Sequence, residues 1–342
     1  MITRATSMQE LLHHLATGVT LNETEAEMAF EAIISGKATT AQISAFLMAL
    51  RVRGETVAEI TGAARTLRAK ALTLAVPSEA IDTCGTGGDA TCTYNISTAA
   101  ALIIAGCGIP VAKHGNRALS SRSGSADVLE ALGVKIDADL VLMSEAMAKA
   151  KICFMLAPKH HDTMHNVMPA RVELGIRTIF NLLGPLSNPA GVRRQVVGVY
   201  SADWLRPMAE GLGRLGAECA WVVHGHDGLD EITTTGPTDI AEYRNGTVHT
   251  FTITPSSAGL AAAHPEDLKG GDASYNAAAI RALLDGALGP FRDIVLLNAA
   301  AGLIVAGIAS NLQEGVIQAT AAVDDGRARA TLEKLVTITN LA

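Results

Sequence analysis

The sequence predicts an α/β fold: a small N-terminal helical domain followed by a large α/β domain with a mainly parallel central sheet. Helix-start signals recur through the first 75 residues, and after Pro77 short apolar runs alternate with helical segments. Such alternation is typical of parallel sheets covered on both faces through right-handed crossovers. The 342 residues, 49% of them hydrophobic and 32 of them glycine, can bury a substantial core in one large and one small domain.

Residues 1–75 are expected to form the helical domain. Capping boxes mark three helix starts: Asn22 with Glu25, Thr39 with Gln42, and Thr56 with Glu59. With glycines placed to stop each helix, the pattern predicts helices near 7–17, 23–35, 40–52 and 57–71. Apolar residues at helical spacing should bury one face of the third helix. Because the helices are short for a freestanding bundle, we expect part of this surface to form a dimer contact, with packing inside the same chain as the alternative.

Residues 76–342 are expected to form the α/β domain. Strands are predicted near 80–84, 110–113, 152–157, 195–200 and 219–224, and helices near 97–106, 125–132, 139–150, 204–215 and 276–288. The segment 239–255 around Asn245-Gly246 predicts an antiparallel hairpin. The last hundred residues are alanine-rich and mostly helical, and could pack back on the helical domain.

Charge and composition exclude several classes of protein. The net charge of -7 argues against nucleic-acid or anionic-membrane partners, which usually leave a basic footprint. Five cysteines without a CxxC pair indicate neither a disulfide framework nor a zinc site. The N-terminus lacks a signal-peptide pattern, and no apolar run reaches the length of a membrane span. We therefore expect a soluble cytoplasmic protein that acts on small molecules.

A glycine-rich loop between Asp82 and Thr98 is the first candidate site. Gly85, Gly87 and Gly88 let the main chain approach an anion, and the following helix start offers partly positive N–H groups and hydroxyls. The alternative is a tight connection without a ligand. The spacing of these glycines matches neither a Walker A loop nor a dinucleotide fingerprint. We therefore predict a phosphate-binding loop of a different type.

A second loop, Lys113-His114-Gly115-Asn116-Arg117, leaves the next predicted strand and is followed by several serines. Two cations and an amide at a strand end could hold a pyrophosphate, although a charge run is often only a solvated face. His114 either takes part directly in the chemistry or has a packing or hydrogen-bonding role.

Two further clusters complete the predicted site. Adjacent carboxylates, Asp230 and Glu231, are either solvated or hold magnesium together with substrate phosphates. The guanidinium of Arg171 matches the carboxylate of a small acid, and a salt bridge to Glu173 or a helix-end contact is the alternative. No Ser-His-Asp or Cys-His arrangement is evident, so covalent catalysis is not expected.

Four blocks in order resemble the signature blocks of the anthranilate phosphoribosyltransferase family: Asp82–Thr98, Lys113–Gly133, Glu173–Pro189 and Val223–Pro237. The resemblance covers nearly the whole chain. It implies a fold like those of nucleoside phosphorylases and phosphoribosyltransferases. It also implies transfer of the 5-phosphoribosyl group from phosphoribosyl pyrophosphate (PRPP) to the amine of anthranilate in tryptophan biosynthesis, with Mg²⁺ and a homodimer joined through the helical domain.

The resemblance also implies site residues, with no residue certain to be catalytic because metal and positioning drive the reaction. For PRPP they are Gly85, Gly88, Asp89, Thr93, Asn95, Ile96, Ser97, Thr98, Lys113, His114, Gly115, Asn116, Arg117, Ala118, Leu119, Ser120, Ser121 and Ser125. For anthranilate they are Gly85, Asn116 and Arg171, and for Mg²⁺ they are Ser97, Asp230 and Glu231. The chain departs from the family at His161-Asp162-Thr163-Met164, where His-Pro-Ala-Met is usual, and at Ala118, where serine is frequent.

Two other functions fit parts of the pattern. A pyrimidine-nucleoside phosphorylase has a related fold but would have no use for the Asp230-Glu231 pair. A noncatalytic nucleic-acid-binding relative would need a basic groove, which the acidic composition does not favour.

Overall fold

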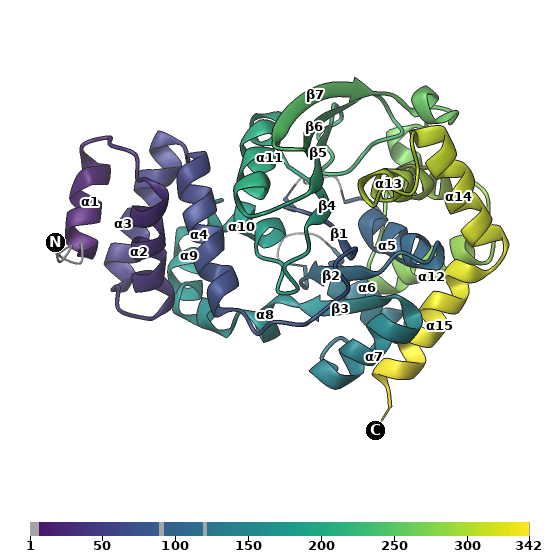
Figure 1. Cartoon of the computed structure of the whole chain (residues 1–342), viewed down its shortest axis with the longest axis horizontal. Helices are drawn as coiled ribbons and strands as arrows, with labels where there is room; N and C mark the ends of the chain where they lie inside the picture. The colour runs from purple at the N-terminus through teal and green to yellow at the C-terminus, as the bar shows by residue number, and fades with distance from the viewer. Residues whose placement is uncertain (1–6, 89–91, 119–121, 342) are drawn as a thin grey trace.

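The computed structural model describes residues 7–88, 92–118 and 122–341 of the chain, and it places a lobe of N-terminal helices beside an α/β lobe (Figure 1). The first lobe contains α1 (Met8–Ala16), α2 (Glu23–Ile34), α3 (Thr40–Arg53) and α4 (Val57–Lys70). Each of these helices begins at a capping box, and the three boxes predicted from the sequence are all formed. The four predicted helices are therefore confirmed.

The sheet has the strand order β3-β2-β1-β4-β5-β6-β7. Its strands are β1 (Ile81–Gly85), β2 (Val111–Gly115), β3 (Ile152–Leu156), β4 (Arg194–Gly198), β5 (Cys219–Gly225), β6 (Thr238–Arg244) and β7 (Thr247–Ile253). The pairs among β1–β5 are parallel, whereas β6 and β7 add as an antiparallel hairpin that turns at Asn245-Gly246. The predicted fold class, a mainly parallel sheet behind a helical domain, is confirmed.

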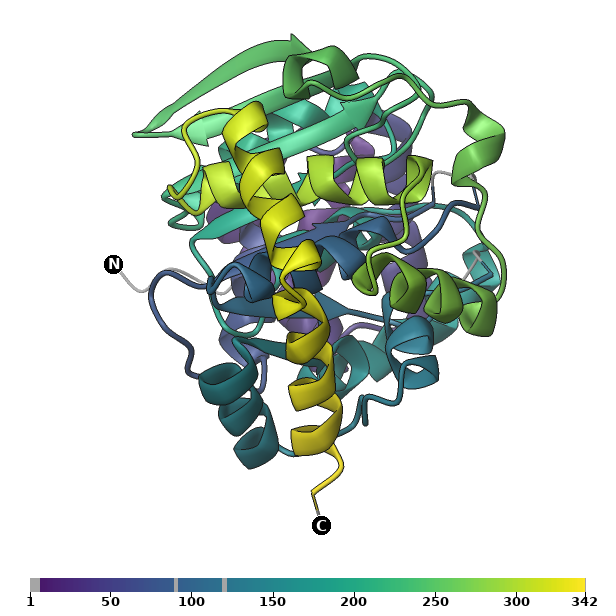
Figure 2. The ribbon, with the colours of Figure 1, turned by 90° about the vertical axis from the view of Figure 1, so that its right-hand side faces the viewer.

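One face of the sheet carries a thick layer of helices. They are α5 (Ile96–Gly106), α6 (Ser125–Ala131), α7 (Leu140–Ala150), α12 (Ala273–Leu284), α13 (Pro290–Val305), α14 (Leu312–Asp324) and α15 (Arg327–Thr339). Figure 2 looks onto this layer, with α14 and α15 running across its outer side. Helix α13 is buried along nearly its whole length because it lies between α5 and α14.

The expectation that the C-terminal helices pack on the helical domain is corrected by this arrangement. They pack mainly on α5 and α7, on the far side of the sheet from α1–α4 (Figure 1). The physical reason is that the parallel strands need apolar cover on that face: α13 packs on β1, β4 and β5, and α15 packs on β3.

The opposite face is continuous with the helical lobe. It is covered by α10 (Phe180–Leu186) and α11 (Leu205–Arg214), and α8 (Ala157–His160) and α9 (Met168–Leu174) precede them. The ring of Phe30 in α2 contacts both Phe46 in α3 and Phe180 in α10, with centroids 5.7 and 5.5 Å apart. One apolar cluster thus joins the helical lobe to the sheet. The helices α8–α10 were not anticipated from the sequence.

Short 3-10 helices complete the described secondary structure: η1 (Asp162–Asn166), η2 (Ala202–Trp204), η3 (Pro255–Ala258) and η4 (Pro265–Leu268). Within the described parts of the chain, no helix combines the length and apolarity needed to cross a bilayer.

Candidate active site

The candidate site lies at the carboxyl ends of β1, β2 and β5. The strand order reverses beside β1, since β2 follows on one side and β4 on the other, and α5 and α10 pack on β1 from opposite faces. Open parallel sheets bind their ligands in the crevice at such a switch point. Each predicted polar loop begins at a strand end here: the glycine loop after Gly85, the second loop after Gly115, and the acidic loop after Gly225.

The acidic pair meets the glycine loop. A carboxylate oxygen of Asp230 accepts a hydrogen bond from the amide of Gly87 at 2.7 Å, and that of Glu231 accepts one from the amide of Ser97 at 3.1 Å. These contacts bring together segments that are 143 and 134 residues apart in the chain. Of the two interpretations left open by the sequence, the solvated turn is therefore wrong, because Asp230 is buried and both carboxylates contact the loop.

Two features hold the acidic loop in place. The buried amide of Asn298 in α13 donates to the carbonyl of Ile232 at 2.8 Å and accepts from its N–H at 3.1 Å. At the end of β4, Gly198 lies so close that an added Cβ would be 1.5 Å from the carbonyl oxygen of Asp230. Only glycine allows this approach of the two backbones.

The acidic pair has the character of a magnesium site. Burial and the neighbouring Asp230 carboxylate raise the pKa of Glu231 to about 8. Two crowded carboxylates are stabilised by a cation, and Mg²⁺ prefers one or two carboxylates plus substrate phosphate oxygens. No group of three His, Cys, Asp or Glu side chains among the described residues could hold a metal by itself. The donor set therefore fits Mg²⁺ that is bound jointly with a phosphorylated ligand.

Lys113 supplies a buried cation beside the acidic pair. Its ammonium group donates to the carbonyl of Thr83 and to the hydroxyl of Ser97, the latter at 3.4 Å. The side chain is only 3% exposed and lies between β1 and the start of α5. Lys113 and Glu231 thus both reach Ser97.

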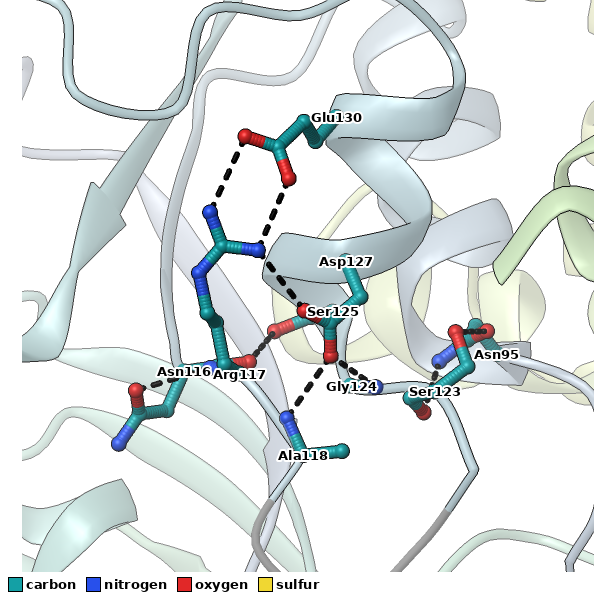
Figure 3. Close-up of polar contacts among 9 residues, drawn as sticks. All are labelled: Asn95, Asn116, Arg117, Ala118, Ser123, Gly124, Ser125, Asp127 and Glu130. Atoms are coloured by element: carbon teal, nitrogen blue, oxygen red, sulfur yellow. Dashed lines mark hydrogen bonds and ion pairs between the residues drawn. The ribbon is translucent and has the colours of Figure 1, made fainter. Parts of the chain in front are cut away.

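The second loop is closed by Asp127 (Figure 3). One oxygen of this carboxylate accepts from the amides of Ala118 and Gly124, both at 2.9 Å, which ties the two ends of the loop together. The guanidinium of Arg117 lies against α6, where it contacts Asp127 at 3.0 Å and Glu130 at 2.8 Å. In this arrangement Arg117 is already paired. Because the pair is exposed to solvent, it is weak and can exchange for another anion.

Asn95 joins the two loops. Its amide donates to the carbonyl of Ser123 at 3.1 Å and its oxygen accepts from the hydroxyl of Ser123 at 3.2 Å (Figure 3). Both loops were predicted to bind phosphate groups. The asparagine side chain between them was not predicted to be the link.

The remaining predicted residues of the first loop are placed as follows. Thr93 forms an isolated bridge with Lys269, and Ile96 lies in the apolar core. Thr98 is buried, with a hydroxyl that has no hydrogen-bond partner among the described residues. Gly85 faces the Asp230 carboxylate, and Gly88 contacts Arg177.

In the second loop, Asn116 is exposed and accepts from the amide of Arg117, while Ser125 donates to the Asn116 carbonyl at 3.3 Å. Gly115 packs against Ser125 and Phe154. Four predicted residues, Asp89, Leu119, Ser120 and Ser121, lie outside the described residues.

Arg171 in α9 carries a half-buried guanidinium that lies over the ring of Phe180, 5.4 Å from its centroid. Burial lowers the pKa of Arg171. The predicted alternative, a salt bridge to Glu173, is not formed, and no carboxylate in the described chain pairs with Arg171. A partly desolvated arginine without an anion is suited to bind the carboxylate of a ligand.

Arg177 was missed by the sequence reasoning. It follows α9, donates to the carbonyl of Gly88, and lies over the ring of Tyr200 at 4.5 Å. Its place within the block Glu173–Pro189 was the available signal, but the contact with the glycine loop depends on tertiary structure.

His114, which lies within β2, forms a buried pair with His161. Their ring centroids are 5.3 Å apart, and each ring contacts a backbone carbonyl, Gly184 for His114 and Ser187 for His161. Burial lowers the pKa of His114 to about 3 and that of His161 to about 4. Both rings are therefore neutral near pH 7, which favours the packing and hydrogen-bonding role for His114.

Comparison with known protein families finds a match to each of the two domains of this chain. Residues 77–329 match the glycosyl transferase family, a/b domain, and residues 9–71 match the helical bundle domain of the same family. An anthranilate phosphoribosyltransferase from Azospirillum brasilense is 62% identical over 335 residues, which cover 98% of this chain and 94% of that protein. The chain belongs to the anthranilate phosphoribosyltransferase family.

Solved structures of the family have the same fold. The anthranilate phosphoribosyltransferase from Thermus thermophilus superposes with a TM-score of 0.92 at 43% identity, covering 97% of this chain and 99% of that one. The Saccharomyces cerevisiae enzyme, solved in complex with PRPP and Mg, superposes with a TM-score of 0.88 at 28% identity, covering 98% and 99%. The family resemblance inferred from the four sequence blocks is confirmed.

Proposed function

We propose that this protein transfers the 5-phosphoribosyl group of PRPP to the amine of anthranilate, giving N-(5-phosphoribosyl)anthranilate and pyrophosphate in tryptophan biosynthesis. The observation that carries the proposal is the contact of Asp230 and Glu231 with the glycine loop, in a chain related end to end to anthranilate phosphoribosyltransferases. No observation favours the nucleoside phosphorylase or the nucleic-acid-binding alternative.

The donor would lie across the glycine loop and the second loop. Backbone amides at the start of α5, the Ser97 hydroxyl and the Lys113 ammonium group face one region at the ends of β1 and β2. The full set of PRPP contacts is the one that the resemblance implied. Asp230 and Glu231, with Ser97, would hold Mg²⁺, which when bound neutralises charge that builds on the departing pyrophosphate.

Arg171 would hold the carboxylate of anthranilate, with Asn116 and Gly85 facing the acceptor. The bond from the anomeric carbon to pyrophosphate breaks as the amine nitrogen forms its new bond to that carbon, and the nitrogen then loses a proton to solvent. Aligning the amine with the anomeric carbon can contribute up to about 7–11 kcal/mol to the barrier reduction. No covalent intermediate with a side chain is required.

The proposed assembly is a homodimer formed through the helical domain, residues 1–75, with residues 76–342 as the catalytic domain. Helix α3 packs side by side with α9 of the second domain, and both helices expose apolar side chains: Met48 and Val52 on α3, Met168 and Val172 on α9. Val52 is 80% exposed and Val172 is 71% exposed. Such a patch is typical of a protein interface. A cytoplasmic location follows from the same biosynthetic role.

The test is direct. Purified protein is incubated with anthranilate, PRPP and Mg²⁺ while the fluorescence of anthranilate is followed. Loss of fluorescence that requires PRPP and Mg²⁺ is expected, and its absence would refute the proposal.

A further inference from the structure

Asn276 is a buried amide that reaches from the C-terminal helices to the glycine loop. It lies in the first turn of α12 and is 1% exposed. Its side-chain oxygen accepts from the amide of Gly271 at 2.8 Å, and its nitrogen donates to the side-chain oxygen of Asn95 at 2.9 Å. Burying an amide costs free energy unless its hydrogen bonds are made, so the position of this side chain is tightly defined.

The contact with Asn276 engages the side chain of Asn95 in hydrogen bonds other than those of a helix cap. Asn95 is the N-cap residue of α5, where an asparagine side chain normally accepts from an amide of the first helical turn. Here the side chain makes no such hydrogen bond. Its oxygen accepts from Asn276 and Ser123, and its nitrogen donates to the Ser123 carbonyl. The side chain of Asn95 is thus turned away from the helix start, where an anion would bind.

The segment before α12 is joined to the glycine loop as well. Thr93 bridges to Lys269, and the amide of Gly270 donates to the carbonyl of Cys92 at 2.9 Å. An added Cβ at Gly270 would lie 2.5 Å from the Thr93 carbonyl oxygen, which shows how closely the two backbones pass. Asn276 adds a side-chain contact to these backbone contacts, and through Asn95 it connects the segment before α12 with the second loop.

We propose that Asn276 is a positioning residue that fixes the spacing of the two loops by holding Asn95 between them. This inference rests on the proposed function, because the loops are taken to bind PRPP together. Asn276 is buried and its side chain is paired with Gly271 and Asn95, so it would act on the substrates only through Asn95. Its loss should let Asn95 turn back to cap α5, which would separate the loops and cover amides that the donor needs.

Steady-state kinetics of Asn276→Ala test the role. The KM for PRPP should rise about tenfold, the effect expected when a buried hydrogen bond that is used in binding is lost. The KM for anthranilate should rise less than the KM for PRPP, because Arg171, the proposed partner of the anthranilate carboxylate, lies on α9 outside both loops. Arg281→Ala is the matched control: Arg281 lies on the same helix and also loses one hydrogen bond, to the Ala131 carbonyl, away from the loops.

A double-mutant cycle separates positioning from general stability. If Asn276 acts through Asn95, then adding Asn276→Ala to Asn95→Ala should raise the KM for PRPP no further. Asn276→Asp keeps the acceptor for Gly271 but removes the donor to Asn95, so it should reproduce the kinetic defect even if the alanine variant folds poorly.

The outcomes distinguish the two claims. A wild-type protein that consumes no anthranilate with PRPP would overturn the function and this inference together. An active wild type with Asn276 variants that match Arg281→Ala, or with additive effects in the cycle, would overturn the positioning role alone.

Discussion

At the scale of single residues, Asp230 contacts more of the segments that form the candidate site than a local turn residue would: it lies against the glycine loop and the end of β4. Its carboxylate receives the Gly87 amide and faces Gly85, while its backbone lies against Gly198 at the end of β4. A single residue therefore connects the acidic loop with the ends of β1 and β4. Charge and geometry at this residue can be separated experimentally because asparagine has the same shape.

Asp230→Asn should weaken magnesium-dependent turnover. The asparagine oxygen still accepts from Gly87, but one carboxylate charge is lost, so we expect the Mg²⁺ concentration for half-maximal activity to rise by about tenfold or more. Activity is measured across a Mg²⁺ titration at saturating PRPP. Asp239→Asn, an acid on β6 that pairs with His226, serves as control. An unchanged titration would contradict the metal assignment.

Arg171→Ala should weaken the use of anthranilate. A charged hydrogen bond contributes about 1.5–3 kcal/mol, so the KM for anthranilate should rise on the order of 10- to 100-fold, while the KM for PRPP stays near wild type. Arg206→Ala, which removes an exposed arginine paired with Glu210, is the control. If both substrates were affected equally, Arg171 would not be the carboxylate ligand.

At the scale of elements, the site depends on strand ends that approach each other without side chains between them. Gly198→Ala would put a Cβ 1.5 Å from the Asp230 carbonyl oxygen. The acidic loop must then shift, and overpacking of this kind typically costs about 1–3 kcal/mol. We expect both a lower melting temperature and a loss of activity. Gly236 lies in the β5–β6 connection, as Asp230 does, but an added Cβ there would meet open space. Gly236→Ala should therefore leave the melting temperature and the activity unchanged.

The buried histidine pair predicts an acid limit to stability. His161 has a pKa of about 4 in the folded protein against an ordinary value of 6.5, so the unfolded chain binds more protons between these values. The contribution of neutral His161 to the free energy of unfolding is fully present above pH 6.5. It is lost as the pH falls toward 4, by up to about 1.4 kcal/mol per pH unit.

Chemical unfolding between pH 4 and 7 checks this prediction. His161→Gln retains a donor for the Ser187 carbonyl and should flatten the acid limb of the profile. His249→Gln, at an exposed position on β7, is the comparison. An acid limb that is equally steep in both variants would show that His161 is not responsible.

At the scale of the whole molecule, the proposed dimer depends on the exposed apolar patch of α3 and α9. Val52→Glu places a charge in that patch and should convert the dimer to a monomer, as measured by light scattering after size-exclusion chromatography. Val141→Glu is matched to it, because Val141 is 73% exposed on α7 in the other lobe. A monomeric wild type, or a Val52→Glu protein that stays dimeric, would contradict the proposed interface.

Most secondary structure and the identity of the loops could be predicted from the sequence, since capping boxes and alternating apolar runs are local signals. The helices α8–α10 could not, because α10 contains Pro185 and is stabilised by packing of Phe180 on Phe30 rather than by its own pattern. The pairing of Arg117 with Glu130 was also beyond the sequence, because a charged side chain can choose among several partners at similar cost.

The sequence by itself determined the chemistry that is available: a glycine loop, a basic loop, two adjacent carboxylates and an arginine suited to a small acid. Only the tertiary structure decided which of these groups meet. Asp230 reaches Gly87 across 143 residues, and Asn276 reaches Asn95 across 181. The physical reason is that parallel strands bring their carboxyl ends to one edge of the sheet whatever their separation in the chain, whereas side-chain contacts there depend on register and close backbone approach.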